Sequence, residues 1–206
     1  MVYQLTDRDI SFLTSNINFT TKSYEKGESI KTRNKYSDKL CLLKEGLIYL
    51  CAENDNFERS ILRIIKNGDI FSRSMLLPDN HGVSYLIAKK TSSVYYFYEK
   101  DVLSFLSTDN GNNEYKEKIT ALLKAQLYQQ PLIHDYILQQ KTIKSKLMAY
   151  IKFECEAQQS DTIKVPIPYS DLAEFLGIDR SAMMKELSKM KEENLIIGQK
   201  KTIKIN

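Results

Sequence analysis

Short apolar runs, separated by turns that contain glycine, make up most of the first half of the chain. KLCLL and LIYLC lie on either side of Gly46, SILRII precedes Gly68, and SVYYFY follows the loop PDNHG. Alternating runs with frequent turns are typical of antiparallel strands. Because no interval between them is long and periodic enough for repeated crossover helices, the pattern predicts an antiparallel sandwich or roll. Ahead of it, residues 6–15 predict a short helix capped by Thr6.

The hydrophobic period changes after the turn-rich segment TDNGNN at 108–113. Residues 114–140 carry apolar side chains at the spacing of three and four that is typical of a helix. This stripe consists of Ile119, Leu122, Leu123, Leu127, Ile133, Tyr136 and Ile137. A small roll cannot cover the whole stripe, so we expect part of it to meet a second copy of the chain; packing along its own domain is the alternative. Pro131 removes a backbone donor, which predicts a kink or break near residues 127–131.

Two short amphipathic patterns lie close together near the carboxyl end, after a helix predicted at 142–157 and a short strand, IKVPIP. The first contains Leu172, Ala173, Phe175 and Leu176, and the second contains Ala182, Met183, Leu187 and Met190. Gly177 is suited to end the first helix, and Asp179 to cap the second. The sequences LIIG and TIKIN around the basic turn QKK predict a β-hairpin wing. The whole predicts a winged helix-turn-helix, with an ordinary helical pair as the alternative.

Composition narrows the class of protein. The 206 residues are 42% apolar and 27% charged, which is typical of globular domains and sufficient for two of them. We find neither the run of about 18 apolar residues that a membrane helix needs nor a secretory signal, so we expect a cytoplasmic protein without a membrane partner. Three cysteines without a CxxC motif and two distant histidines favour neither a disulfide scaffold nor a metal site, so we expect no cofactor.

Basic charge gathers at the carboxyl end. Of the net charge of +4, residues 180–206 contribute seven basic against three acidic side chains, which indicates a polyanion partner or an ordinary solvated surface. Arg180 is the only arginine after residue 73 and begins the second short helix. A guanidinium can form two hydrogen bonds with guanine O6 and N7, which favours base recognition. A capping or ion-pair role with Asp179 or Glu174 is the alternative.

Through these motifs the sequence resembles the Crp/Fnr family of bacterial transcription regulators along essentially its whole length. The residues that carry the resemblance are DLAEFLGIDRSAMMKELSKMKEENLI, YEKGESI, the hairpin around Gly46 and NGDIF at Gly68. The resemblance implies an α+β fold with a jelly-roll-like antiparallel β-roll of the cyclic-nucleotide-binding type over 1–111, a dimerisation helix over 112–140 and a winged helix-turn-helix over 141–206. It implies a homodimer on a palindromic double-stranded DNA site, contact with RNA polymerase, and no enzymatic activity.

The resemblance also assigns candidate residues. The implied base contacts are Arg180, Ser181, Met184 and Lys185. The implied phosphate contacts are Ser170, Lys189, Lys191, Lys200 and Lys201. The implied dimer contacts are Ile119, Leu122, Leu123, Ile133, Tyr136 and Ile137. Met184 departs from the family pattern, and its apolar side chain either contacts a thymine methyl group or packs within the protein.

The sensor half departs further from the family. Members that bind cyclic AMP carry a glutamate just after the GDIF-like glycine and then an Arg-Ser pair, whereas Arg73 and Val83-Ser84 stand at these places here. We therefore do not expect cyclic-nucleotide binding, and the effector is unknown. A pocket of Arg73, Ser74, Ser84 and Tyr85 would suit another small anion, with a surface position for Arg73 as the alternative. Cys41 and Cys51 are expected to pack as small apolar residues.

Two other classes of function compete with this interpretation. The first is a protein-interaction module whose winged helix binds a protein partner instead of DNA. The second is a cupin-like enzyme, because a similar roll hosts metal chemistry in that class. Such an enzyme needs clustered histidine and carboxylate ligands at strand spacing, which two histidines 53 positions apart do not provide.

Overall fold

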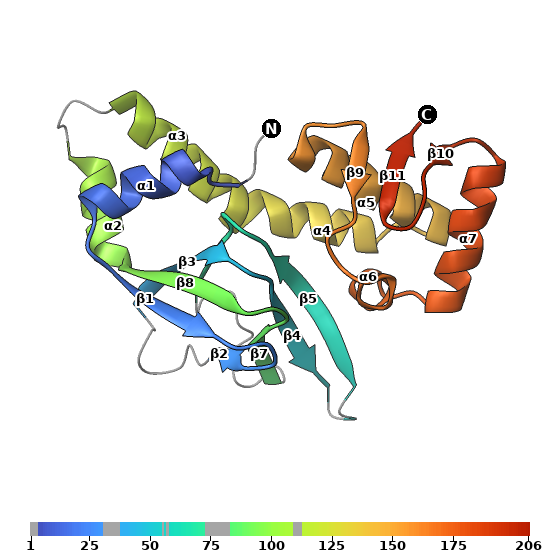
Figure 1. Ribbon diagram of the computed structural model, residues 1–206, viewed down its shortest axis with the longest axis horizontal. Helices are drawn as coiled ribbons and strands as arrows, with labels where there is room; N and C mark the ends of the chain where they lie inside the picture. Colours follow the sequence, from blue (N-terminus) through green and yellow to red (C-terminus); the bar gives the residue numbers. More distant parts are fainter. Residues whose placement is uncertain (1–3, 31–37, 55, 57, 73–82, 109–112) are drawn as a thin grey trace. The chain divides into compact units, whose positions relative to one another are not determined.

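A computed structural model describes residues 4–30, 38–54, 56, 58–72, 83–108 and 113–206 of the chain (Figure 1). The chain divides into two compact units. We call Tyr3–Tyr128 the roll unit and Gln129–Asn206 the winged unit. Each unit has its own elements and is described by itself.

Eight strands of the roll unit form two four-stranded sheets. In chain order they are β1 (Phe19–Tyr24), β2 (Ser29–Ile30), β3 (Lys39–Glu45), β4 (Ile48–Glu53), β5 (Arg59–Ile65), β6 (Ile70–Ser72), β7 (Val83–Ala88) and β8 (Ser92–Tyr98). One sheet has the order β1-β8-β3-β6 and the other the order β2-β7-β4-β5. Every pairing is antiparallel, which confirms the predicted roll.

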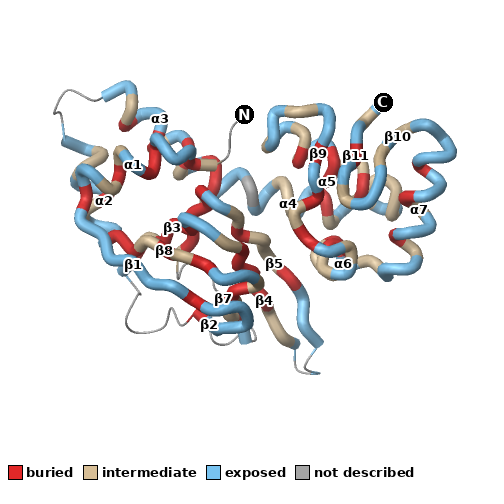
Figure 2. Tube along the Cα trace, viewed as in Figure 1, coloured by how far each residue is buried: buried red, intermediate tan, exposed pale blue. Residues whose placement is uncertain are grey.

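Both sheets contribute to one apolar core. Figure 2 shows buried positions recurring along the strands, as expected when alternate side chains face inward. Cys41 and Cys51 are both buried, and burial raises the pKa of Cys41 to about 12. Cys41 belongs to this apolar core, which confirms its predicted packing as a small apolar residue, and Cys51 is 0% exposed in β4. Deep in the same core, the hydroxyl groups of Tyr24 and Tyr96 lie 2.5 Å apart and share a hydrogen bond.

Three helices of the roll unit pack around a second apolar cluster. They are α1 (Asp7–Asn16), α2 (Glu99–Ser107) and α3 (Asn113–Lys124). Thr6 caps α1 in a capping box with Asp9, as the sequence predicts. Ile119 and Leu122 of α3 are 0% and 7% exposed within this cluster, and Leu123 packs against it. These three positions of the predicted dimer helix are therefore largely covered by their own chain.

A π-helical turn follows α3. It spans Ala125–Gln129 and leads into α4 (Gln130–Leu138), which has Pro131 in its first turn. Proline has no N–H to donate to the carbonyl four residues earlier, so a regular α-helical ladder cannot pass this point, and a wider turn is one way to accommodate the loss. The irregularity predicted near residues 127–131 is present as a π-helical turn through which the chain stays helical, and the division between the two units falls between Tyr128 and Gln129.

The rest of the winged unit consists of α5 (Ile143–Gln158), β9 (Thr162–Lys164), α6 (Tyr169–Leu176), α7 (Arg180–Glu192), β10 (Ile196–Ile197) and β11 (Thr202–Ile205). The strands form an antiparallel sheet in the order β10-β11-β9. Helix α7 packs against α5 and α6. Two short helices followed by a hairpin confirm the predicted winged helix-turn-helix.

Gly68 and Gly27 provide a matched pair for a stability test. Both have positive φ (+80° and +89°), but a Cβ at Gly68 would overlap the carbonyl oxygen of Leu5, whereas one at Gly27 meets no described atom within 4 Å. Gly27→Ala should lower the free energy of unfolding by about 1–2 kcal/mol, because alanine is strained at positive φ. Gly68→Ala should lower it by about 1–3 kcal/mol more, through steric overlap. Urea denaturation of both variants checks this, and equal losses would contradict it.

Candidate nucleic-acid interface

The turn between α6 and α7 is fixed by one glycine and one aspartate. Gly177 has φ +60°, and the N–H of the next residue donates to the carbonyl of Ala173 at 3.0 Å. Such a left-handed residue is the usual way to end a helix sharply. The carboxylate of Asp179 then accepts a hydrogen bond from the N–H of Ala182 at 2.8 Å and caps α7. Both predicted caps are confirmed.

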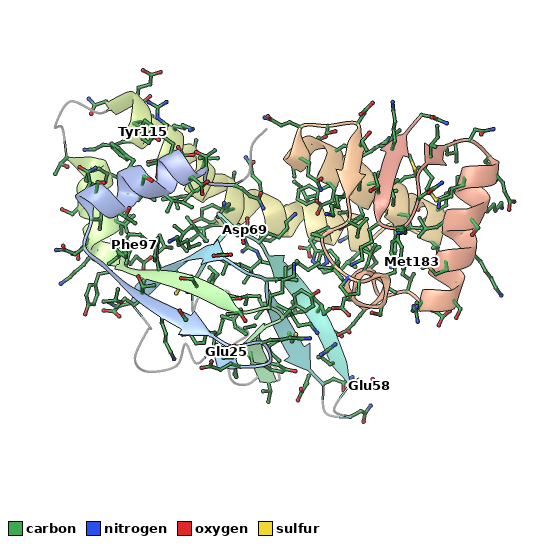
Figure 3. The ribbon with its side chains drawn as sticks, in the orientation of Figure 1. Glu25, Glu58, Asp69, Phe97, Tyr115 and Met183 are labelled. Atoms are coloured by element: carbon green, nitrogen blue, oxygen red, sulfur yellow. The ribbon has the colours of Figure 1, made fainter. Side chains whose placement is uncertain are left out.

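Helix α7 buries one side and exposes another. Met183, Leu187 and Met190 are 0%, 4% and 0% exposed; Figure 3 labels the first of them. The residues that the same two turns leave exposed are Arg180, Ser181, Met184 and Lys185. The structure therefore brings all four predicted base contacts together on the uncovered surface at the start of α7.

Arg180 is available for a ligand. Within the described part of the chain its side chain forms no hydrogen bond or ion pair, and the capping role belongs to Asp179. The first turn of α7 contains no acidic residue. Because a helix begins with free N–H groups and a partial positive charge, the guanidinium adds to a potential that already attracts anions.

The wing turn lies beside the start of α6. Lys200, between β10 and β11, is exposed, and Lys201 is half-buried. The hydroxyl of Tyr169, the first residue of α6, donates to the carbonyl oxygen of Lys200 at 2.6 Å. This bond brings the exposed Ser170 and the wing lysines, three of the predicted phosphate contacts, to one region. Tyr169 was not among the predicted site residues, although it directly precedes Ser170.

The other two predicted phosphate contacts lie at the far end of α7. Lys189 and Lys191 belong to its last turn, so Lys189 lies about 13 Å along the axis from Arg180. The ammonium of Lys189 is 3.9 Å from the carboxylate of Glu193, which also accepts a hydrogen bond from Lys144 at 2.6 Å. The structure therefore separates these two lysines from the exposed group at the start of α7.

Helix α6 is held at its carboxyl end by α4 and α5. The imidazole of His134 stacks on Phe175 with ring centroids 4.2 Å apart, and its Nε2 is 3.4 Å from the carbonyl oxygen of Phe175. From α5, Lys146 donates to the carbonyl oxygen of Leu176 at 3.1 Å. Burial lowers the pKa of His134, so the ring is neutral at pH 7. The contact of His134 with Phe175 was not predicted from the sequence.

Among the remaining predicted dimer positions, only Tyr136 is strongly exposed, at 62%. Ile137 is 1% exposed, and Ile133 is half-buried. Leu132, which lies four residues before Tyr136 on the same side of α4, is 68% exposed. The apolar surface that α4 leaves open thus consists chiefly of Leu132 and Tyr136, and Leu132 was not among the predicted positions.

The predicted effector pocket is only partly described. Arg73 and Ser74 lie outside the described residues. Ser84 is buried on the face of β7 that also carries the core residue Leu86. Tyr85 lies on the opposite face, because successive strand residues alternate, and its hydroxyl donates to Glu53 at 2.8 Å. Burial and this hydrogen bond raise the pKa of Tyr85 to about 12. Ser84 and Tyr85 therefore do not line the same side of the sheet.

Membrane spanning and metal binding each require a recognisable set of residues. None of the described helices has the length and apolar character that crossing a membrane requires. Three or more His, Cys, Asp or Glu side chains do not come together anywhere in the described ranges as the ligands of a metal ion would.

Models of two known domains match most of the chain. A model of the cyclic nucleotide-binding domain matches residues 21–109, and one of the Crp-like helix-turn-helix domain matches residues 143–206. No curated protein sequence matches the chain.

Solved structures share the fold at low sequence identity. A CooA mutant from Carboxydothermus hydrogenoformans has a TM-score of 0.68 at 18% identity, over 98% of this chain and 94% of that one. A cyclic nucleotide-binding domain containing protein from Listeria monocytogenes has 0.67 at 16% identity, over 97% and 96%. FixK2 from Bradyrhizobium japonicum has 0.66 at 16% identity, over 92% and 93%. The arrangement of elements is therefore shared along nearly the whole chain.

The buried His134 predicts a stability that depends on pH. Since its pKa is lower in the folded than in the unfolded chain, the unfolded chain takes up the proton first as the pH falls below about 6.5. The free energy of unfolding should therefore decrease between pH 8 and pH 5. His134→Phe preserves the stacking on Phe175 but does not titrate, so its stability should decrease less over the same range. Urea denaturation at both pH values measures the difference, and equal decreases in the two proteins would refute the prediction.

Proposed function

Since the chain belongs to the Crp/Fnr family of transcription regulators, we propose that it is a homodimer that binds a palindromic DNA site through α7 and the wing of each copy. Members of this family regulate transcription and are not enzymes, which answers the cupin-like alternative. A regulator of this kind acts on the chromosome together with RNA polymerase, so we place the protein in the cytoplasm.

The observation that carries the proposal is the uncovered polar group at the start of α7. Arg180, Ser181 and Lys185 are exposed, while the same turns bury Met183. In helix-turn-helix proteins the first turns of the second helix reach the base edges in the major groove. Arg180 is suited to donate two hydrogen bonds to guanine. Lys185 can donate to guanine from its ammonium group, and Ser181 can form hydrogen bonds with several bases.

Contacts to DNA phosphates would hold α7 at a fixed position in the major groove. Ser170, Lys200 and Lys201 lie near the bond from Tyr169 to the wing, and Lys189 and Lys191 lie at the other end of α7. Contacts to phosphate fix position and raise affinity without reading sequence. Each one also makes binding more sensitive to salt, because it releases counterions from the DNA.

A second copy of the chain would explain the exposed apolar side of α4. Leu132 and Tyr136 are 68% and 62% exposed, and pairing two such helices would remove both from water. A twofold axis would place the two copies of α7 about 34 Å apart, one turn of B-DNA. The half-sites would then form a palindrome with that spacing.

We propose an effector other than cyclic AMP for the roll unit, and no resident cofactor. The support comes from Val83, a residue that is 58% exposed and stands where family members that bind cyclic AMP carry the arginine for the cyclic phosphate. An uncharged side chain cannot neutralise that group.

Selection of genomic fragments with the purified protein tests the proposed function. The selection should enrich one palindromic motif, and repeating it with metabolite extract shows whether a small molecule changes affinity. Weak binding to all fragments that does not depend on salt would contradict DNA recognition. It would favour the protein-interaction alternative instead.

Substituting Arg180 and Lys200 separates base reading from positioning. Arg180→Ala should weaken operator binding by about 1–3 kcal/mol and reduce the preference for operator over random DNA. Lys200→Ala should weaken binding to both DNAs about equally and lower the salt slope by about one. Titrations at several salt concentrations measure both effects. If the two variants behaved alike, the assigned roles would be wrong.

A charge on the open side of α4 should prevent dimerisation. Leu132→Asp would bring a carboxylate into the apolar contact between copies, so we expect a monomer with much weaker operator binding and an unchanged circular dichroism spectrum. Leu103→Asp makes the same change at a leucine of α2 that is 61% exposed, and this protein should remain dimeric. Light scattering during size exclusion reports the mass. A dimeric Leu132→Asp protein would show that the copies meet elsewhere or that the side chain lies at the rim.

A further inference from the structure

Met184 is an apolar side chain on a surface that is otherwise polar. It is 38% exposed on the first two turns of α7, between Arg180, Ser181 and Lys185. Isolated apolar side chains are common on protein surfaces. This one differs because it stands at the centre of the group that the proposed function assigns to base edges.

Met184 does not belong to the fully buried side chains of α7. The neighbouring Met183 is 0% exposed and fills the contact of α7 with the rest of the unit, together with Leu187 and Met190. The hydrogen bond that involves Met184 uses only its backbone, whose carbonyl accepts from the hydroxyl of Ser188 at 3.1 Å. The thioether side chain is therefore partly exposed and has no polar partner among the described residues.

The chemistry of the side chain restricts what it can contact on DNA. Methionine carries no charge and no hydrogen-bond donor, so it does not bind phosphate and cannot satisfy the amino group of adenine or cytosine. In the major groove, the apolar group that distinguishes one base pair from the others is the C5-methyl group of thymine. The flexible thioether chain adapts easily to such a small apolar surface.

We infer that Met184 reads thymine by contact with its methyl group, so that each half-site contains a thymine close to the guanine bonded by Arg180. This inference rests on the proposed binding of DNA by α7. Four residues separate Arg180 from Met184, which is about 6 Å along the helix. Since successive bases lie about 3.4 Å apart along the DNA axis, the thymine lies within about two base pairs of that guanine.

Replacing thymine by uracil tests this contact, because it removes the methyl group and nothing else. Each thymine of the selected operator is replaced in turn, symmetrically in both half-sites, and affinity is measured by fluorescence anisotropy. For the wild-type protein, one position per half-site should lower affinity about three- to five-fold for each methyl group lost. For Met184→Ala the same replacement should have no effect.

Two variants on the same surface serve as controls. Met184→Leu keeps an apolar side chain and should retain sensitivity to uracil. Ser181→Ala changes the neighbouring position and should retain that sensitivity whatever its own affinity for the operator. Thermal denaturation confirms that all three variants are folded.

The outcomes separate the two proposals. A preferred operator with no uracil effect, or with equal effects in the wild type and Met184→Ala, overturns the role of Met184 and leaves DNA recognition by α7 intact. Absence of any preferred operator overturns the proposed function, and the role of Met184 with it.

Discussion

The burial of one side of α7 decides what the protein can present to a ligand. Met183, Leu187 and Met190 are almost completely covered, and the cap at Asp179 sets where the helix begins. Each residue turns an α-helix by about 100°, so the burial of these three side chains fixes the direction in which every other residue of α7 faces. The left-handed Gly177 ends α6, so that Asp179 can cap α7 and Arg180 stands in its first turn.

A buried amide fixes the π-helical turn of the roll unit. The side chain of Gln126, in the π-helical turn, accepts from the N–H of Ile70 at 2.6 Å and donates to the carbonyl of Gly68 at 3.0 Å. Arg63 adds a bond of 3.3 Å to the backbone carbonyl of Gln126. Breaking such a fully buried pair of bonds typically costs several kcal/mol, because the groups left behind have no water to replace them. The irregular turn is thus tied to the junction of β5 and β6, where the NGDIF motif lies.

Local features of the sequence predicted local structure well. Thr6, Gly177 and Asp179 each act on backbone groups within a few residues, so a single sequence contains all the information that their roles need. The antiparallel sheets followed from period and turn spacing for the same reason. The likeness of α6, α7 and the wing to known regulators was recognisable because their turn residues and apolar positions stand at fixed distances.

Contacts between distant segments were not predictable in this way. The bond from Tyr169 to the wing, the stacking of His134 on Phe175 and the tie made by Gln126 each join segments that no periodicity relates. The stripe through Ile119 and Leu122 correctly marked a buried side, but a stripe does not show which surface covers it, and here that surface is the roll unit itself. The placement of Ser84 and Tyr85 in one pocket is a different case. Consecutive residues of a strand point to opposite faces of a sheet, so the sequence alone already argued against that pocket.

The basic side chains of the winged unit are not equally available to a ligand, because some of them are paired with carboxylates. Residues 141–206 contain 12 basic and 9 acidic side chains, a modest excess. Glu193 forms ion pairs with Lys144 and Lys189, and Asp161 forms one with Lys204. The hydrogen bond from Lys144 holds the pKa of Glu193 below its usual range.

Those pairs are exposed and individually weak. A DNA phosphate that binds Lys189 must nevertheless compete with the carboxylate of Glu193. Arg180 has no such competitor among the described residues. The difference favours the start of α7 as the place where a polyanion gains most from direct contact, with Lys189 contributing less than its position on the helix alone would indicate.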